Sequence, residues 1–253
     1  MSEHVRVEAG NGVLAITLAR PERRNAITVA MYAALADAIE GVAKDESVRL
    51  VTIRGLGPDF AAGNDLADFL QELPDDLTDI PVWRLLRALV ACPVPLVAAV
   101  HGNCVGIGTT MLLHCDFVIA ARSARFSMPF VDLGLVPEAA SSLLVPRLAG
   151  HRRAARYLLL GEPFDAGEAL AIGLASHVVD DSALDSELAG LVEALLAKPA
   201  EALRQARALL RHGEQDEISE RMNLESRVFA ERLRSAEVAR AIDAFFAARA
   251  TRA

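Results

Sequence analysis

Short apolar runs alternate with segments of helical periodicity over the first half of the chain, and this alternation limits the possible folds more than any other feature. Residues 13–18 form an apolar run between a Gly-Asn-Gly turn and Pro21, which is typical of a strand. Residues 28–43 have the spacing of a half-buried helix, with Thr28 as its expected N-cap. Further strands are expected at 48–53, 95–100, 117–121 and 124–130, and a further helix at 109–114. Strands that alternate with helices predict an α/β core whose parallel sheet is covered by helices.

The character of the chain changes from about Leu184 onward. Strand-like runs end there, and helix formers with interspersed arginine and acidic residues dominate. We therefore expect a core at residues 1–190 and a helical region at residues 191–253. The apolar stripes of these helices are expected to pack within the chain, while the last helix, with Phe245 and Phe246, is also suited to burial against another subunit.

Charge and cysteine content argue against several classes of protein. The sequence has 34 acidic and 26 basic side chains, and the resulting net charge of −8 argues against a nucleic-acid partner. Its three cysteines form no CxxC pair, so neither a disulfide framework nor a zinc site is expected. The N-terminus lacks the apolar core of a signal peptide, and the longest uncharged apolar stretch, residues 88–100, is too short to span a membrane. These features predict a cytoplasmic protein without a membrane partner or a bound metal.

Familiar cofactor and nucleophile motifs are missing from the sequence. The GIGTTM segment at residues 106–111 lacks the third glycine of a dinucleotide loop, and there is no Walker loop, G-x-S-x-G elbow or H-E-x-x-H pair. Two glycine-containing turns remain, FAAGNDL at residues 60–66 and HGNCVGIG at residues 101–108, and each follows a predicted strand. If the turns face each other, two backbone N–H groups can point at one oxygen and form an oxyanion hole. The alternative is that both turns are ordinary strand exits.

The amino-acid sequences of these two turns resemble those of the crotonase superfamily, the enoyl-CoA hydratase/isomerase family. Other segments similar to the family are RPERRNAI at 20–27, FDAGEA at 164–169 and AFFAAR at 244–249. The resemblance implies a spiral of ββα repeats with a C-terminal helical segment for trimerisation. It also implies an acyl-CoA thioester as the substrate, no cofactor beyond the coenzyme A of that substrate, and assembly as a homotrimer or a dimer of trimers.

The resemblance further implies roles for residues of the two turns. The backbone N–H groups of Asn64 and Ile107 would hold the thioester oxygen. The family generally has glycine where Ile107 stands, and a β-branched residue disfavours positive φ. Arg24 is suited to the phosphates of coenzyme A, because guanidinium groups bind phosphate well. The residues expected at the substrate are Arg24, Ala62, Asp65, Leu66, Gly106, Phe130 and Leu133.

The carboxylates of the sequence distinguish between the reactions of the family. Its hydratases use two glutamates, but the corresponding positions hold Thr110 and Phe130, and neither side chain activates water as a carboxylate does. The segment PFVDLGLVPE at residues 129–138 instead resembles Δ3,Δ2-enoyl-CoA isomerases of the peroxisomal type, in which the glutamate after the second proline is the base. The resemblance therefore implies an enoyl-CoA isomerase with Glu138 as its single catalytic base.

One carboxylate is sufficient for this reaction. In a 3-enoyl thioester the C2 proton lies between the carbonyl and the alkene, so one base can remove it and return it at C4. Apolar neighbours of Glu138 would raise its pKa toward about 6–7. Two alternatives stay open: an enoyl-CoA hydratase of low efficiency, and a non-catalytic acyl-CoA-binding protein in which Glu138 points away from the ligand.

Overall fold

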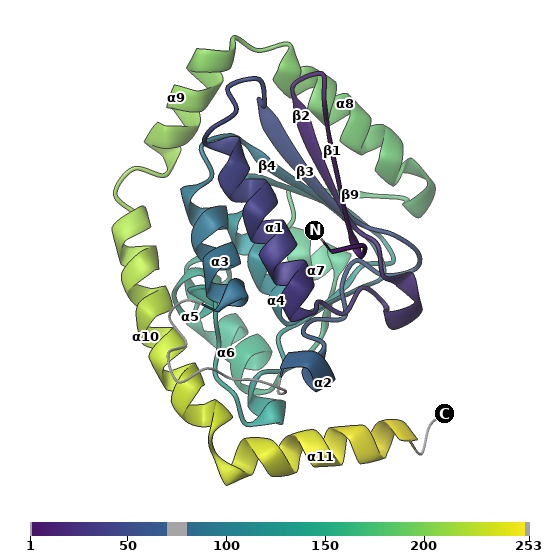
Figure 1. Ribbon diagram of the computed structural model, residues 1–253, viewed down its shortest axis with the longest axis vertical. Helices are drawn as coiled ribbons and strands as arrows, with labels where there is room; N and C mark the ends of the chain where they lie inside the picture. The colour runs from purple at the N-terminus through teal and green to yellow at the C-terminus, as the bar shows by residue number, and fades with distance from the viewer. Residues whose placement is uncertain (1, 70–79, 251–253) are drawn as a thin grey trace.

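The main sheet of the protein contains six strands in the order β1-β2-β3-β4-β6-β9. The computed structural model describes residues 2–69 and 80–250 (Figure 1). Strands β1 (Val5–Gly10) and β2 (Val13–Leu18) form an antiparallel hairpin, and every further pair in this sheet is parallel. The remaining strands are β3 (Leu50–Gly55), β4 (Leu96–Val100), β6 (Phe117–Ala121) and β9 (His177–Val179). The predicted α/β class with a parallel sheet is therefore confirmed.

A smaller sheet lies beyond the ends of the main strands. It has the order β5-β7-β8 and consists of β5 (Asn103–Val105), β7 (Arg125–Ser127) and β8 (Phe164–Asp165). Because β5 directly follows β4 and β7 directly follows β6, the chain repeats a long strand followed by a short one. The first glycine-containing turn joins this layer through a parallel bridge between Ala61 and Cys104.

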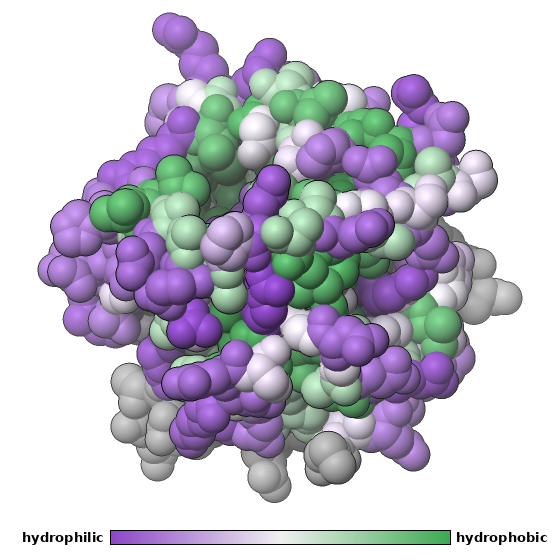
Figure 2. Space-filling view, turned by 90° about the horizontal axis from the view of Figure 1, so that it is seen from above, coloured by the Kyte–Doolittle hydropathy of each residue, from purple (hydrophilic) through white to green (hydrophobic). Residues whose placement is uncertain are grey.

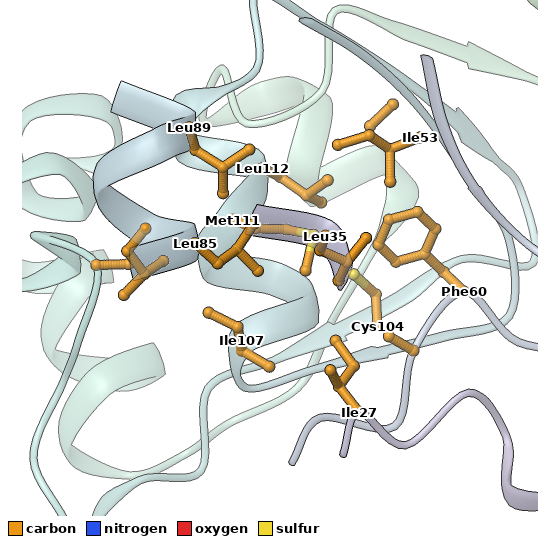
Figure 3. Close-up of a cluster of buried hydrophobic side chains, with 14 of the residues drawn as sticks. Ile27, Leu35, Ile53, Phe60, Leu85, Leu89, Cys104, Ile107, Met111 and Leu112 are labelled. Atoms are coloured by element: carbon orange, nitrogen blue, oxygen red, sulfur yellow. The ribbon is translucent and has the colours of Figure 1, made fainter. Parts of the chain in front are cut away.

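Helices cover both faces of the main sheet. Helix α1 (Val29–Val42) begins at the predicted N-cap, because the Thr28 hydroxyl accepts a hydrogen bond from the Met31 N–H at 3.2 Å. It packs beside α3 (Pro81–Ala91) on one face, and α8 (Leu184–Leu196) lies on the other (Figure 1). Figure 3 shows the first of these cores, in which Leu35, Leu85 and Ile107 approach one another. Since both faces are covered, every residue of β4 is buried.

Three expected elements differ from the observed ones at their ends. The helix predicted at 109–114 begins earlier, as α4 (Ile107–Thr110), and continues as the 3-10 helix η2 (Met111–His114). The strand predicted at 124–130 ends at Ser127, because Pro129 has no N–H with which to continue the pairing. The strand predicted at 48–53 spans β3, two residues further along the chain.

The C-terminal helices wrap around one side of the molecule (Figure 1). They are α9 (Ala200–Leu210), α10 (Gln215–Leu233) and α11 (Ala236–Ala250). Residue 190, where the core is expected to end, lies inside α8, and Leu184, Leu188 and Leu195 of this helix pack on the same face of the sheet. The other helical segments are η1 (Pro21–Arg23), α2 (Leu66–Phe69), η3 (Val131–Leu133), α5 (Ser141–Ala149), α6 (His151–Leu159), α7 (Ala166–Ala171) and η4 (Asp181–Ala183).

The surface is mixed in character. Seen from above, apolar side chains lie in the middle and toward the top of the view, with hydrophilic ones between them and along much of the edge (Figure 2). Leu209 and Leu210, at the end of α9, are 75% and 82% exposed. In the part of the chain that the structure describes, no helix is both long enough and apolar enough to cross a membrane.

Candidate active site

A cavity of about 310 Å³ lies where the two glycine-containing turns meet the C-terminal helices. Its wall contains all nine residues predicted for the oxyanion hole and the substrate contacts, namely Arg24, Ala62, Asn64, Asp65, Leu66, Gly106, Ile107, Phe130 and Leu133. Phe229 of α10 and Phe246 of α11 also line it. The structure therefore brings together residues that are far apart in the sequence. Glu138 is not part of this wall.

The first turn presents the backbone N–H of Asn64. The Ile27 N–H donates to the Gly63 carbonyl at 2.8 Å, and the Asp65 N–H donates to the Ile27 carbonyl at 2.9 Å. Asn64 lies between these two bonds, and among residues 2–69 and 80–250 its own N–H has no hydrogen-bond partner. Gly63 has a φ of +86°, a conformation that favours glycine. The N–H of Asn64 is therefore available to a ligand in the cavity.

The second turn presents the backbone N–H of Ile107. Ile107 is the first residue of α4, so its N–H is one of the donors that a helix leaves without an internal partner, and no described residue accepts from it. The positive φ of this turn, +56°, belongs to Gly106. Ile107 itself is helical, which is why a β-branched side chain is tolerated at this position. That side chain is 1% exposed and packs into the core (Figure 3).

The two turns are packed directly against each other. A Cβ atom on Gly63 would lie 3.0 Å from the Val105 carbonyl oxygen, and one on Gly108 would lie 3.0 Å from the Cβ of Ala61. The N–H of Val105 also donates to the Ala61 carbonyl at 2.9 Å. Glycine at both positions thus allows the close approach that aligns the two turns.

Asp65 stabilises the first turn. Its carboxylate accepts a hydrogen bond from Arg20 Nη1 at 2.6 Å and a longer one from the Asp68 N–H at 3.4 Å. Partial burial raises the pKa of Asp65, but the hydrogen bond and the charge of Arg20 oppose it, and the pKa is lowered overall. Asp65 is therefore a charged partner of Arg20, and its geometry suits a role in holding the turn.

Tyr32 is a residue of this region that the sequence reasoning missed. It lies on α1, is 1% exposed, and its hydroxyl donates a hydrogen bond to Asn64 Oδ1. Burial and, to a lesser extent, the nearby Glu138 carboxylate raise the pKa of Tyr32 well above its ordinary value. A tyrosine on the otherwise apolar face of the predicted helix was the one available signal.

Glu138 is buried outside the cavity wall. Its side chain is 1% exposed, and its Oε1 accepts a hydrogen bond from the Thr110 hydroxyl at 3.0 Å. Burial raises the pKa of Glu138 from 4.5 to about 8, the Thr110 hydrogen bond opposes this rise, and the charge of Glu225 adds to it. The pKa is thus raised further than the sequence suggested, and the carboxylate is a stronger base than an ordinary glutamate.

Three further charged residues line the cavity, one aspartate and two arginines. Asp132 lines the cavity and is exposed. Arg23 and Arg24 also line it, and the Arg24 side chain is 67% exposed, with its Nε 3.7 Å from Asp59 Oδ2. Residues 2–69 and 80–250 form no group of three or more His, Cys, Asp or Glu side chains that could hold a metal ion. The cavity wall therefore offers the backbone N–H groups of Asn64 and Ile107 and two arginines, while the buried Glu138 lies outside it.

Comparisons with known proteins show similarity over nearly the whole chain. Residues 8–252 match the family model described as enoyl-CoA hydratase/isomerase. The chain is 34% identical to the 1,2-epoxyphenylacetyl-CoA isomerase of Escherichia coli (strain K12), over 98% of this chain and 97% of that protein. It is also 34% identical to enoyl-CoA delta isomerase 2 of Homo sapiens, over 84% of this chain and 55% of that protein. The crystal structure of an enoyl-CoA hydratase/isomerase from Pseudoalteromonas atlantica T6c superposes with a TM-score of 0.91 at 41% identity, covering 96% of this chain and 97% of that one.

Proposed function

The chain belongs to the enoyl-CoA hydratase/isomerase family, and on this premise we propose that it is a Δ3,Δ2-enoyl-CoA isomerase. Glu138 is the observation that carries the proposal, because it is a fully buried carboxylate of raised pKa, bonded to Thr110 in the helix that begins with the wall residue Ile107. Thr110 and Phe130 stand where hydratases of the family have glutamates, and Thr110 donates its hydroxyl to Glu138. This arrangement favours proton transfer by one base over the addition of water.

The proposed reaction moves one proton and regenerates the base. The Glu138 carboxylate takes the C2 proton of a 3-enoyl thioester, and the resulting dienolate carries its charge on the thioester oxygen and on C4. The N–H groups of Asn64 and Ile107 hold that oxygen, and each such donor typically lowers the barrier by about 2.7–4 kcal/mol. The protonated Glu138 then returns the proton at C4, which yields the 2-enoyl thioester.

Contact between Glu138 and the substrate requires a change in the cavity wall. Glu138 lies outside the wall. Leu135, three residues before it, and Ile107, in the same helix as its partner Thr110, are part of the wall. A bound acyl chain must therefore open the wall far enough for C2 and C4 to meet the carboxylate. A structure with an unreactive acyl-CoA analogue tests this step, and the proposal fails if more than one water separates Glu138 from the reactive carbons.

The coenzyme A portion is proposed to lie at the mouth of the cavity. Coenzyme A carries several negative charges, and the chain itself has a net charge of −8, so local cations are needed to receive it. Arg23 and Arg24 line the cavity and supply that charge. We propose Arg24 as the phosphate contact, since most of its side chain is exposed.

The activity test compares two substrates and two variants. A 3-enoyl-CoA is expected to be converted to the conjugated 2-enoyl-CoA, which is followed by its ultraviolet absorbance, whereas a 2-enoyl-CoA is expected to be hydrated poorly. Glu138→Gln should lower kcat by about 100-fold or more, as loss of a general base does. Asp132→Asn tests the competing acid at the rim. Loss of turnover in Asp132→Asn with full turnover in Glu138→Gln would show that the base is assigned wrongly.

We also propose a cytoplasmic homotrimer as the working form, which follows from the family resemblance and from the cysteine usage. The exposed Leu209 and Leu210 at the end of α9 support an association surface. Sedimentation velocity of the full chain measures the assembly directly, and a monomer at micromolar concentration would contradict the proposal.

A further inference from the structure

Glu225 reaches from the C-terminal helix α10 into the segment that follows Glu138. It is 5% exposed, and its carboxylate accepts three hydrogen bonds from that segment. The Ala140 N–H donates to Oε2 at 2.6 Å, and the N–H and hydroxyl of Ser142 donate to Oε1 at 3.0 and 2.5 Å. Arg221, one turn earlier on α10, donates to the Ser142 hydroxyl at 3.2 Å. The three hydrogen bonds that the Glu225 carboxylate accepts thus all come from residues 140–142.

The segment held by Glu225 has a strained backbone. Ala139 and Ala140 have φ values of +59° and +56°, a left-handed conformation that residues other than glycine rarely adopt. Such a conformation persists only where the surroundings enforce it. On the other side of the segment, His114 Nε2 lies 3.0 Å from the Ala139 carbonyl oxygen. Burial lowers the pKa of His114 to about 4, so the ring is neutral at working pH and donates this bond from Nε2.

The strained segment begins at the residue directly after Glu138, and its conformation decides where the Glu138 carboxylate points. The Ser141 N–H donates to the Glu138 carbonyl at 2.9 Å, which closes a turn over the two strained alanines. Glu225 is itself absent from the cavity wall. A change at Glu225 therefore removes no contact between the cavity wall and a ligand.

We propose that Glu225 is a positioning residue for Glu138: by clamping residues 140–142 it holds the catalytic carboxylate in its reactive orientation. This inference rests on the proposed isomerase function. The titratable or polar groups that face Glu138 are Thr110, Tyr32 and Glu225, and Arg221 stands beside Glu225 through Ser142. Burial raises the pKa of Glu225, while the hydrogen bonds from Ser142 and Ala140 and the charge of Arg221 oppose that rise.

Glu225→Gln is the informative variant because it keeps the volume and removes the charge. The amide has one oxygen, so its NH2 group must face either the Ala140 N–H or the Ser142 donors, and at least one bond of the clamp is lost. We expect kcat to fall by about 10- to 100-fold, the size of effect that a small misplacement of a reacting group has. The KM for the acyl-CoA should stay within about threefold, because the cavity wall is unchanged. Glu220→Gln, an exposed position on the same helix, is the control and should retain parental kinetics.

A second measurement is independent of turnover. Titration of Glu138 by NMR, with carbon-13 at the glutamate carboxyls and Glu138→Gln used for assignment, should show a lower midpoint in Glu225→Gln than in the parent, because a neighbouring negative charge has been removed. Ser142→Ala removes a single donor and should lower kcat by about threefold to tenfold, so the inference stays testable even if Glu225→Gln folds poorly.

The outcomes separate the two proposals. A kcat loss with little change in KM and a lowered Glu138 midpoint support the positioning role. Parental kcat in Glu225→Gln, or parallel losses of kcat and thermal stability with an unchanged midpoint, would overturn it and leave Glu225 as an anchor of α10. If the parent protein does not isomerise a 3-enoyl-CoA but the midpoint still moves, the isomerase proposal fails and the coupling between Glu225 and Glu138 stands.

Discussion

The Thr110 hydroxyl donates a hydrogen bond to Glu138 Oε1 across 3.0 Å, and both side chains are fully buried. Thr110 ends the short helix α4 that begins with Ile107, so one helical turn links the second glycine-containing turn to the buried carboxylate. This bond stabilises the charged form of Glu138 against the effect of burial. It therefore controls the pH range in which the carboxylate can act as a base.

Replacing Thr110 by valine is expected to raise the pKa of Glu138 above about 8. A hydrogen bond to a charged group is worth about 1.5–3 kcal/mol, which corresponds to roughly one to two pH units. The isomerase activity of Thr110→Val at pH 7 should fall accordingly and recover at higher pH. Thr110→Ser keeps the hydroxyl and should keep the parental profile. Identical profiles for the valine and serine variants would show that the hydroxyl does not act on the base.

The pH dependence of the parent enzyme follows from the raised pKa of Glu138. The carboxylate is the active form, so kcat/KM for a 3-enoyl-CoA should rise with pH and level off above about 8. The midpoint of this rise, measured with initial rates in overlapping buffers, reports the pKa in the free enzyme. A flat profile from pH 6 to 9 would assign the base to another group.

The same pKa predicts how stability depends on pH. Folding raises the pKa of Glu138 from 4.5 to about 8, so the contribution of the buried neutral acid is complete below pH 4.5 and is lost as pH rises through 8. Glu138→Gln is always neutral and should match the parent near pH 5. At pH 9 it should exceed the parent in free energy of unfolding by on the order of 2–4 kcal/mol. Urea unfolding at both pH values measures the difference, and an equal difference at both would be inconsistent with a buried titrating acid.

Tyr32→Phe should weaken the proposed oxyanion site. The hydroxyl donates to Asn64 Oδ1, and its loss frees the residue whose N–H is proposed to hold the thioester oxygen. Because one neutral hydrogen bond is worth about 0.5–1.5 kcal/mol, kcat/KM should fall by roughly 2- to 12-fold. Tyr157→Phe is a matched control, since the Tyr157 hydroxyl is bonded to Glu168, which lies outside the cavity wall. Equal losses in both variants would point to general destabilisation.

Gly63→Ala should abolish most activity by displacing the first turn. The new Cβ would lie 3.0 Å from the Val105 carbonyl oxygen at a backbone φ of +86°, so the two turns would be forced apart. Loss of one oxyanion donor costs about 100- to 1000-fold in kcat. Gly190→Ala, in the middle of α8 with no atom within 4 Å of the new Cβ, should instead stabilise the protein by about 1 kcal/mol and leave kcat unchanged.

The features that are local in sequence could be predicted well. The strand at β2 and the N-cap of α1 at Thr28 follow from short patterns, and the structure has both where they were expected. Four of the residues expected around the substrate, Ala62, Asp65, Leu66 and Gly106, lie in two short turns, and the turns meet in one cavity. A β-branched residue such as Ile107 disfavours positive φ, so the sequence leaves open how it fits the turn. The structure shows that the positive φ belongs to Gly106 and that Ile107 is helical.

The features that depend on contacts between distant residues could not be predicted. Glu225 is bonded to Ser142, which lies 83 residues earlier, and Tyr32 of helix α1 is bonded to Asn64 in the first glycine-containing turn. Each does interrupt an apolar stripe: Glu225 lies between the buried Met222 and Phe229 on α10. A polar residue on a buried helix face was therefore a usable signal, but the sequence does not show which partner it would meet.

The wall of the cavity extends from Arg23 near one end of the chain to Phe246 near the other. A ligand that contacts both ties the first and last parts of the fold together, and its binding energy is then added to the stability of the whole chain. An acyl-CoA should consequently slow cleavage by proteases in the C-terminal helices as much as in the glycine-containing turns. The lifetime of the protein in a cell would then increase with the supply of its ligand.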